Sequence, residues 1–140
     1  MNIRWNPHYF FQGEDTEVSN SLDEIVGETL DCVEGLEQDS EQVIFVTKSG
    51  KAIKLHHEQD CCECVDLNDF ENDVENFDGA KVLSFEEVSC QEFETSYSDT
   101  QTWTFYKLET NRGGLWMRWL GESNGYYSEN VDILGGVVVE

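Results

Sequence analysis

The stretch QTWTFYKLETNRGGLWMRWL, residues 101–120, carries the strongest secondary-structure signal in this chain. Aromatic and β-branched residues are typical of strands, and they fill both of its halves, WTFYKL and LWMRWL. Turn residues separate the halves at NRGG, residues 111–114. The stretch therefore predicts a long antiparallel hairpin. We expect its large side chains in the core or, if one face is exposed, in a homodimer or partner interface: Trp103, Phe105, Trp116 and Trp119.

Shorter strand signals surround this hairpin. The run EQVIFVTKSGKAIKLHH, residues 41–57, predicts a second hairpin that turns at Gly50, where glycine supplies a positive φ. The run AKVLSFEEVSCQEF, residues 80–93, predicts a further strand. Together these signals indicate about five to seven antiparallel strands.

Two segments predict short helices. Ser21 followed by Glu24 forms a capping-box pattern that opens SLDEIVGETL, residues 21–30. The run CVDLNDFENDVENFDG, residues 64–79, is expected to begin as a strand and to continue as an acidic helix capped by Asn68 or Asp69. The predicted fold class is α+β, a mainly antiparallel β-sheet with one or two short helices. We expect one domain over residues 21–140 and a mobile N-terminal segment over residues 1–20.

The charge of the chain limits the partners that it can bind. Its 140 residues include 30 acidic and 8 basic side chains, for a formal net charge of −22. Such a field repels phosphate backbones and anionic lipid headgroups, and it attracts cationic surfaces. We therefore expect no direct nucleic-acid or membrane binding, and a basic protein surface as the partner. The chain has no apolar run of about 18 residues and no signal-like start, so we expect a cytoplasmic protein.

The acidic residues are concentrated in runs without any cation. One run lies between Lys54 and Lys81, and apolar residues are spaced within it, which indicates a folded segment with an acidic face. We expect this face to bind the partner through Glu58, Asp60, Glu63, Asp66, Asp69, Glu71, Asp73, Glu75 and Asp78.

The segment HHEQDCCEC, residues 56–64, groups candidate metal ligands. His57, Cys61, Cys62 and Cys64 form a candidate zinc site, but zinc usually takes two Cys-x-x-Cys pairs and this chain has one. The alternative is a set of buried structural thiols. The five cysteines are an odd number, which favours reduced thiols over a disulfide framework. The surrounding acids raise thiol pKa values and disfavour thioredoxin-like chemistry.

A second candidate binding loop lies in GESNGYYSEN, residues 121–130. Its candidate residues are Glu122, Ser123, Asn124, Tyr126 and Tyr127; the alternative is a structural turn with a buried tyrosine hydroxyl. Catalytic motifs are missing, since HEQDC lacks the second histidine of a zinc protease and no nucleophile elbow is present. We therefore expect no enzyme and no required cofactor.

Four motifs together resemble a family of uncharacterised proteins common in tailed-phage genomes. They are HEQDCCE (57–63), WTFY (103–106), RW (118–119) and GESNGYYSE (121–129), and the similarity covers about residues 21–133. The resemblance implies a phage-encoded protein of unknown function, with no activity or cofactor to transfer. The chain departs from the family pattern at Cys64 and in the acidic stretch 71–78.

These observations lead to one function hypothesis with two alternatives. A folded frame with many carboxylates can imitate nucleic acid and inhibit a host DNA-handling or defence enzyme, as anti-CRISPR or anti-restriction proteins do. Such a protein would act in the host cytoplasm during infection. The alternatives are a small zinc module built on HHEQDCCEC and a phage accessory protein that binds through its aromatic hairpin.

Overall fold

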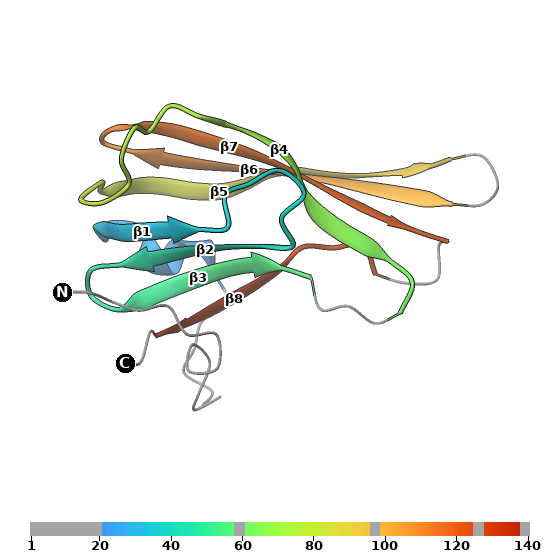
Figure 1. Ribbon diagram of the computed structural model, residues 1–140, viewed down its shortest axis with the longest axis horizontal. Helices are drawn as coiled ribbons and strands as arrows, with labels where there is room; N and C mark the ends of the chain where they lie inside the picture. The colour runs from blue at the N-terminus through green and yellow to red at the C-terminus, as the bar shows by residue number, and fades with distance from the viewer. Residues whose placement is uncertain (1–20, 58–60, 96–98, 125–127, 138–140) are drawn as a thin grey trace.

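The structure is a computed structural model that describes residues 21–57, 61–95, 99–124 and 128–137. The segment 1–20, expected to be mobile, lies outside the described residues. Within them, one single-turn 3₁₀ helix precedes eight strands (Figure 1). The elements are η1 (Leu22–Ile25), β1 (Leu30–Glu34), β2 (Gln42–Thr47), β3 (Lys51–His56), β4 (Cys64–Asn72), β5 (Val82–Glu94), β6 (Thr100–Thr110), β7 (Gly113–Ser123) and β8 (Asp132–Val137). The described chain is mostly antiparallel β with almost no helix, so the prediction of mainly antiparallel strands was correct. The strand count is higher than the five to seven expected, the strands form two sheets, and the predicted helices are nearly absent from this part of the chain.

The strands form two four-stranded antiparallel sheets. The first has the order β1-β2-β3-β8 and the second the order β4-β7-β6-β5. Figure 1 shows the sheets as two layers, with the second sheet above the first. The chain builds three strands of the first sheet, all four of the second, and then returns to the first with β8.

One hydrophobic core fills the space between the layers. Both sheets contribute fully buried side chains, and η1 adds two more. The rings of Phe45 from β2 and Phe85 from β5 meet edge to face across this space, with centroids 4.9 Å apart. The largest fully buried residues are Trp119, Tyr106, Phe45, Ile25, Leu30, Ile44, Ile53, Leu55, Leu67, Leu108 and Leu115. Because one core joins both sheets, the described residues behave as a single domain.

Both predicted hairpins are confirmed. Strands β2 and β3 pair from Gln42–His56 to Val46–Ala52, and Gly50 closes the turn at φ +91°. Strands β6 and β7 pair over eleven residues, and Gly113 takes φ +134° directly after the turn. Local turn chemistry and β propensity were sufficient to define both hairpins.

Both helix predictions were wrong in extent or in type. The segment 21–30 forms only the single turn η1, because Gly27 takes φ +88° and Leu30 already belongs to β1. The Ser21 hydroxyl does cap this turn, accepting a hydrogen bond from the amide of Asp23 at 3.2 Å. The segment 64–79 is strand β4 followed by a loop, not an acidic helix.

The side chains of the long hairpin alternate between the two faces of the second sheet. Trp119 is fully buried in the core, as expected, together with Tyr106. Trp103, Phe105 and Trp116 point to the outer face, where Trp116 is 41% exposed. The prediction that all four large side chains lie in the core was therefore wrong for three of them, because successive residues of a strand face opposite ways.

Candidate functional site

Carboxylates from three segments meet along the outer side of strand β4. Asp66, Asp69 and Glu71 lie on the outer face of β4, and Glu122 lies on neighbouring β7, paired in register with Cys64. The loop 35–41 runs beside β4, and Ser40 forms an isolated β-bridge with Leu67. The Asp39 amide donates to the carbonyl oxygen of Leu67 at 2.7 Å, and the Leu67 amide donates to the carbonyl oxygen of Ser40 at 2.8 Å. We call this group the β4 acidic edge: Asp39, Glu41, Asp66, Asp69, Glu71 and Glu122.

The electrostatics of Asp66 show that these carboxylates act on one another. Partial burial raises the pKa of Asp66, and the charges of Asp39, Glu122 and Glu41 raise it further. Like charges that interact in this way are close in space, although they come from three separate parts of the chain. The β4 acidic edge is therefore a concentrated negative surface.

The structure assembles the predicted acidic face only in part. Asp66, Asp69 and Glu71 lie on the β4 acidic edge, and Asp73, Glu75 and Asp78 are exposed in the loop that follows β4. Two of these acids already bind a cation, because Asp69 pairs with Arg118 and Asp78 accepts from Lys48 at 2.6 Å. Glu58 and Asp60 lie outside the described residues.

Glu63 was wrongly assigned to the acidic face. Its side chain is fully buried and accepts a hydrogen bond from the Cys61 amide at 2.8 Å, while its other oxygen lies 3.0 Å from Nε2 of His57. Nδ1 of His57 donates to the carbonyl oxygen of Asn130 at 2.8 Å. Both ring nitrogens therefore face acceptors, an arrangement that favours the imidazolium form.

The balance of effects on His57 agrees with this geometry. Burial lowers the pKa of His57, but the Glu63 carboxylate, the Asn130 carbonyl and the nearby Asp132 carboxylate outweigh burial, and the net pKa is raised. The His57–Glu63 pair joins the residue after β3 to the residue before β4, and the hydrogen bond from His57 to Asn130 holds this pair against the segment that precedes β8. Its chemistry is that of a buried structural ion pair.

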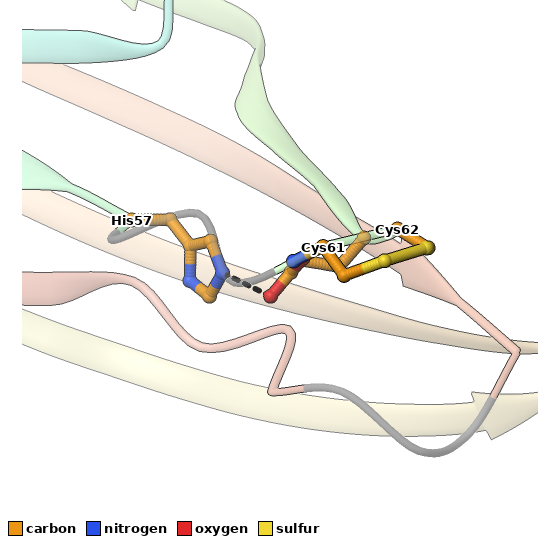
Figure 2. Close-up of a disulfide and its surroundings, with 4 residues drawn as sticks. His57, Cys61 and Cys62 are labelled. Atoms are coloured by element: carbon orange, nitrogen blue, oxygen red, sulfur yellow. Dashed lines mark hydrogen bonds and ion pairs between the residues drawn. A yellow bond between two sulfur atoms is a disulfide. The ribbon is translucent and has the colours of Figure 1, made fainter.

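The cysteines differ from both sequence-based alternatives. Cys61 and Cys62 are joined by a disulfide, so the expectation of reduced thiols was wrong for this pair (Figure 2). Cys64 and Cys90 are exposed and Cys32 is half-buried, so these free thiols are not core residues. Burial and the neighbouring carboxylates raise the pKa of Cys64 above its usual value and that of Cys32 to about 11, which disfavours nucleophilic thiolates.

The proposed zinc ligands do not form a coordination set in the described residues. His57 is held by Glu63 and Asn130, and two of the three candidate sulfurs are in the disulfide. The third, Sγ of Cys64, lies 3.7 Å from Oδ2 of Asp66. Within residues 21–57, 61–95, 99–124 and 128–137, no group of three or more histidine, cysteine or acidic side chains is arranged to hold a metal ion.

The second candidate loop is divided between strand and turn. Glu122 and Ser123 belong to β7, Asn124 is exposed directly after it, and Tyr126 and Tyr127 lie outside the described residues. The Ser123 hydroxyl is buried and donates to the Glu129 carboxylate, so it faces the interior and not a ligand. Glu122 is exposed and contributes to the β4 acidic edge instead.

Beside the β4 acidic edge, the outer side of β6 and β7 carries three large rings and two cations. We call this surface the aromatic face: Trp103, Phe105, Lys107, Trp116 and Arg118. Nζ of Lys107 lies 4.7 Å from the ring centroid of Trp116, and Cζ of Arg118 lies 5.4 Å from that of Trp103. Both arrangements are cation–π contacts.

A groove of about 350 Å³ joins the aromatic face to the β4 acidic edge. Its lining combines the rings of Phe105 and Trp116 with the side chains of Asp69, Glu71 and Arg118. The strand register explains this juxtaposition, because Glu71 is paired with Trp116 and Asp69 with Arg118 across β4 and β7. Sequence reasoning missed this groove, since its walls come from strands about 45 residues apart.

Comparison with known protein families places most of the chain in one family. The model of a domain of unknown function, DUF7448, matches residues 22–133. The chain belongs to the DUF7448 family. Its DUF7448 domain begins with η1 and ends within β8, so it includes the β4 acidic edge, the aromatic face and the His57–Glu63 pair. The matched range agrees with the range of about 21–133 over which the sequence resembles a family of uncharacterised proteins.

No curated protein and no solved structure matches the chain. In the described residues, no helix is long and apolar enough to cross a membrane.

Proposed function

We propose that this protein is a phage-encoded acidic binding protein that imitates nucleic acid and inhibits a host DNA-handling or defence enzyme, of the anti-CRISPR or anti-restriction type. The observation that carries the proposal is the β4 acidic edge, in which three separate segments bring like charges together on the folded domain. The phage origin rests on the resemblance of the sequence motifs, and the place of action would be the host cytoplasm.

The scaffold supports the proposal because a strand holds its charges at fixed spacing. Alternate residues on one face of a strand are about 6.7 Å apart, close to twice the rise of about 3.4 Å per phosphate along one strand of DNA. Pairing with β7 on one side and with Ser40 on the other restricts the movement of β4. A preformed row of carboxylates attracts a basic channel from a distance, and salt weakens that attraction.

An affinity pull-down from host lysate at low and high salt tests the proposal. The expected result is a basic nucleic-acid-binding protein that is retained at low salt and released at high salt. Reversing charge at two exposed positions of the edge that form no salt bridge in the described residues, Glu71→Lys and Glu122→Lys, should abolish capture. The matched control reverses exposed acids of η1, Asp23→Lys and Glu24→Lys, because η1 contacts β5 at the opposite border of the sheet. Equal capture by both variants would contradict nucleic-acid mimicry.

The exposed rings of the aromatic face favour a second candidate function. A phage accessory protein that binds through Trp103, Phe105 and Trp116 would form a complex insensitive to salt and sensitive to ring removal. The same pull-down separates the two functions, since only the accessory protein retains its partner at high salt.

The zinc module remains a separate proposal with its own measurement. Elemental analysis of protein purified without chelator, with and without a reductant that opens the Cys61–Cys62 disulfide, tests it directly. Less than one zinc per chain in both samples would exclude the module.

A further inference from the structure

We propose that the groove between the β4 acidic edge and the aromatic face binds an arginine side chain of the partner protein. The proposal rests on the proposed function and specifies its chemistry: the partner presents arginine, and Trp116, Phe105 and Glu71 receive it. The groove of about 350 Å³ is lined by the rings of Trp116 and Phe105 and by two carboxylates, and because Asp69 already pairs with Arg118, Glu71 is the carboxylate that an incoming guanidinium meets.

The structure already contains the recognition geometry within the chain. The guanidinium of Arg118 lies over the ring of Trp103 and donates to the carboxylate of Asp69. On the same face, the ammonium group of Lys107 lies over the ring of Trp116, and its Nζ lies 2.7 Å from Oε1 of Glu109. The outer face of this sheet therefore holds cations beside a tryptophan ring and a carboxylate at two places. The groove shares Trp116 and Asp69 with these two places and adds Phe105 and the carboxylate of Glu71.

Charge decides which class of ligand enters. The outer face of the second sheet carries six carboxylates and two cations in the described residues, an excess of four negative charges: Asp66, Asp69, Glu71, Glu86, Glu109 and Glu122 against Lys107 and Arg118. A polyanion is repelled by this excess, and so is the same face of a second copy of the chain. A purely apolar segment would remove carboxylates from water without a counter-charge, which is costly.

Arginine fits this groove better than lysine for a geometric reason. Its planar guanidinium stacks on an aromatic ring and at the same time presents parallel N–H donors to a carboxylate. Glu71 stands opposite Trp116 in the strand register, so stacking and pairing are available from adjacent strands. The described residues place no cation against Glu71.

The test uses the full chain and two synthetic peptides, one with four arginines separated by Gly-Ser and one with lysine at the same positions. Affinity is measured by calorimetry at low salt. We expect the arginine peptide to bind more tightly than the lysine peptide. Trp116→Ala should weaken arginine-peptide binding about three- to thirtyfold, the range of a cation–π contact that is partly removed from water. Glu71→Gln should weaken it about two- to fivefold, as for an exposed ion pair.

Matched controls come from η1 and the residue that follows it: Val26→Ala removes an exposed apolar side chain, and Glu24→Gln removes an exposed charge. Neither should change the affinity. Circular dichroism confirms that each variant is folded, and Glu71→Gln keeps the test valid if Trp116→Ala does not fold.

Three outcomes would overturn the inference. In the first, the arginine peptide binds wild type and both groove variants equally, while charge reversal of the β4 acidic edge abolishes binding. Electrostatic attraction to the whole acidic surface would then explain the peptide binding, so the groove inference fails and the proposed function stands. If single-stranded oligonucleotide binds in place of the peptide, the groove inference and the mimicry proposal both fail. If the chain dimerises through Trp116, the face is an interface between copies.

Discussion

The side chain of Glu129 is a carboxylate held in the interior by hydroxyl groups. It accepts from Thr102 at 2.9 Å and also from Thr100 and Ser123, which places donors from β6 and β7 around it. Only 6% of the residue is exposed. The network attaches the segment before β8 to the far end of the second sheet, where the inner face is lined by threonines and not by apolar residues.

Removing this carboxylate should destabilise the fold. In Glu129→Ala, three hydroxyl groups lose their acceptor, and each buried polar group left unsatisfied costs about 1–3 kcal/mol. We expect a loss of about 3 kcal/mol or more in the free energy of unfolding, measured by urea denaturation. The control Glu122→Ala, at an exposed position of β7, should change it by less than about 0.5 kcal/mol. Similar losses in the two variants would mean that the hydroxyl network does not stabilise the fold.

The His57–Glu63 pair predicts a pH dependence of stability. Because the folded-state pKa of His57 is raised above the ordinary value of 6.5, its contribution is complete below that pH and is lost as pH rises through the folded-state pKa. Wild type should therefore exceed Glu63→Gln in stability most clearly in mild acid, and the difference should shrink above neutrality. Urea unfolding of both proteins across this range measures the difference, and NMR titration of the imidazole locates the pKa. A difference that grows with pH would refute this assignment.

Single residues show where prediction from sequence fails. Glu63 was assigned to an acidic surface because it stands in a row of acids, but the hydrogen bonds to His57 and to the Cys61 amide direct its side chain inward. No local pattern encodes that choice. It depends on Asn130, which fixes the other side of the His57 ring from more than 70 residues away.

At the scale of elements, the close contact between β7 and the following segment depends on Gly121. A Cβ atom at this position would collide with the backbone carbonyl and the side chain of Glu129. Gly121→Ala should therefore cost about 1–3 kcal/mol, the usual penalty of overpacking, measured as a shift of the urea midpoint. Gly114→Ala in the same strand is the control, because its Cβ would meet its nearest atom at 3.7 Å, an ordinary contact. Equal effects at both glycines would show that the contact is looser than the structure indicates.

The elements that were predicted correctly are those defined by short-range chemistry. Both hairpins have turn residues between β-rich runs, and both formed as expected. The end of strand β4 was predicted as a helix because Asn68 and Asp69 are typical capping residues. In the structure these two residues lie at a bulge between Leu67 and Asp69, and bulges favour irregular backbone that a cap-like pattern does not distinguish from a helix start.

At the scale of the whole molecule, the net charge of −22 opposes the compact state. Few of the acids have a cation beside them in the described residues, and the exposed pairs, such as Lys48–Asp78, are screened by water. Adding potassium chloride should therefore stabilise the protein by about 1 kcal/mol, which corresponds to an increase of about 3–5 °C in Tm for a chain of this size. Thermal unfolding from low to physiological ionic strength measures the effect. An unchanged Tm would mean that the acids are too far apart to repel one another.

The arrangement of the two sheets could not be predicted from the sequence. Strands β3 and β8 pair in register from Lys51–Val137 to His56–Asp132, and no pattern in either strand specifies the other. The β4 acidic edge has the same limitation, since Asp39 and Glu41 reach it through the bridge between Ser40 and Leu67. The acidity of the surface was evident from composition, but its concentration along β4 required the fold.

The late position of β8 in the chain has a consequence for biosynthesis. About 75 residues separate β3 from β8. At a synthesis rate of about 5–20 residues per second, the side of β3 that pairs with β8 therefore stays without its partner strand for about 4 to 15 seconds. Unprotected borders of this kind recruit strands from other nascent chains. Lys51 and Lys54, two of only eight basic residues, lie on β3 itself, and lysine ammonium groups are a common defence against such misassembly.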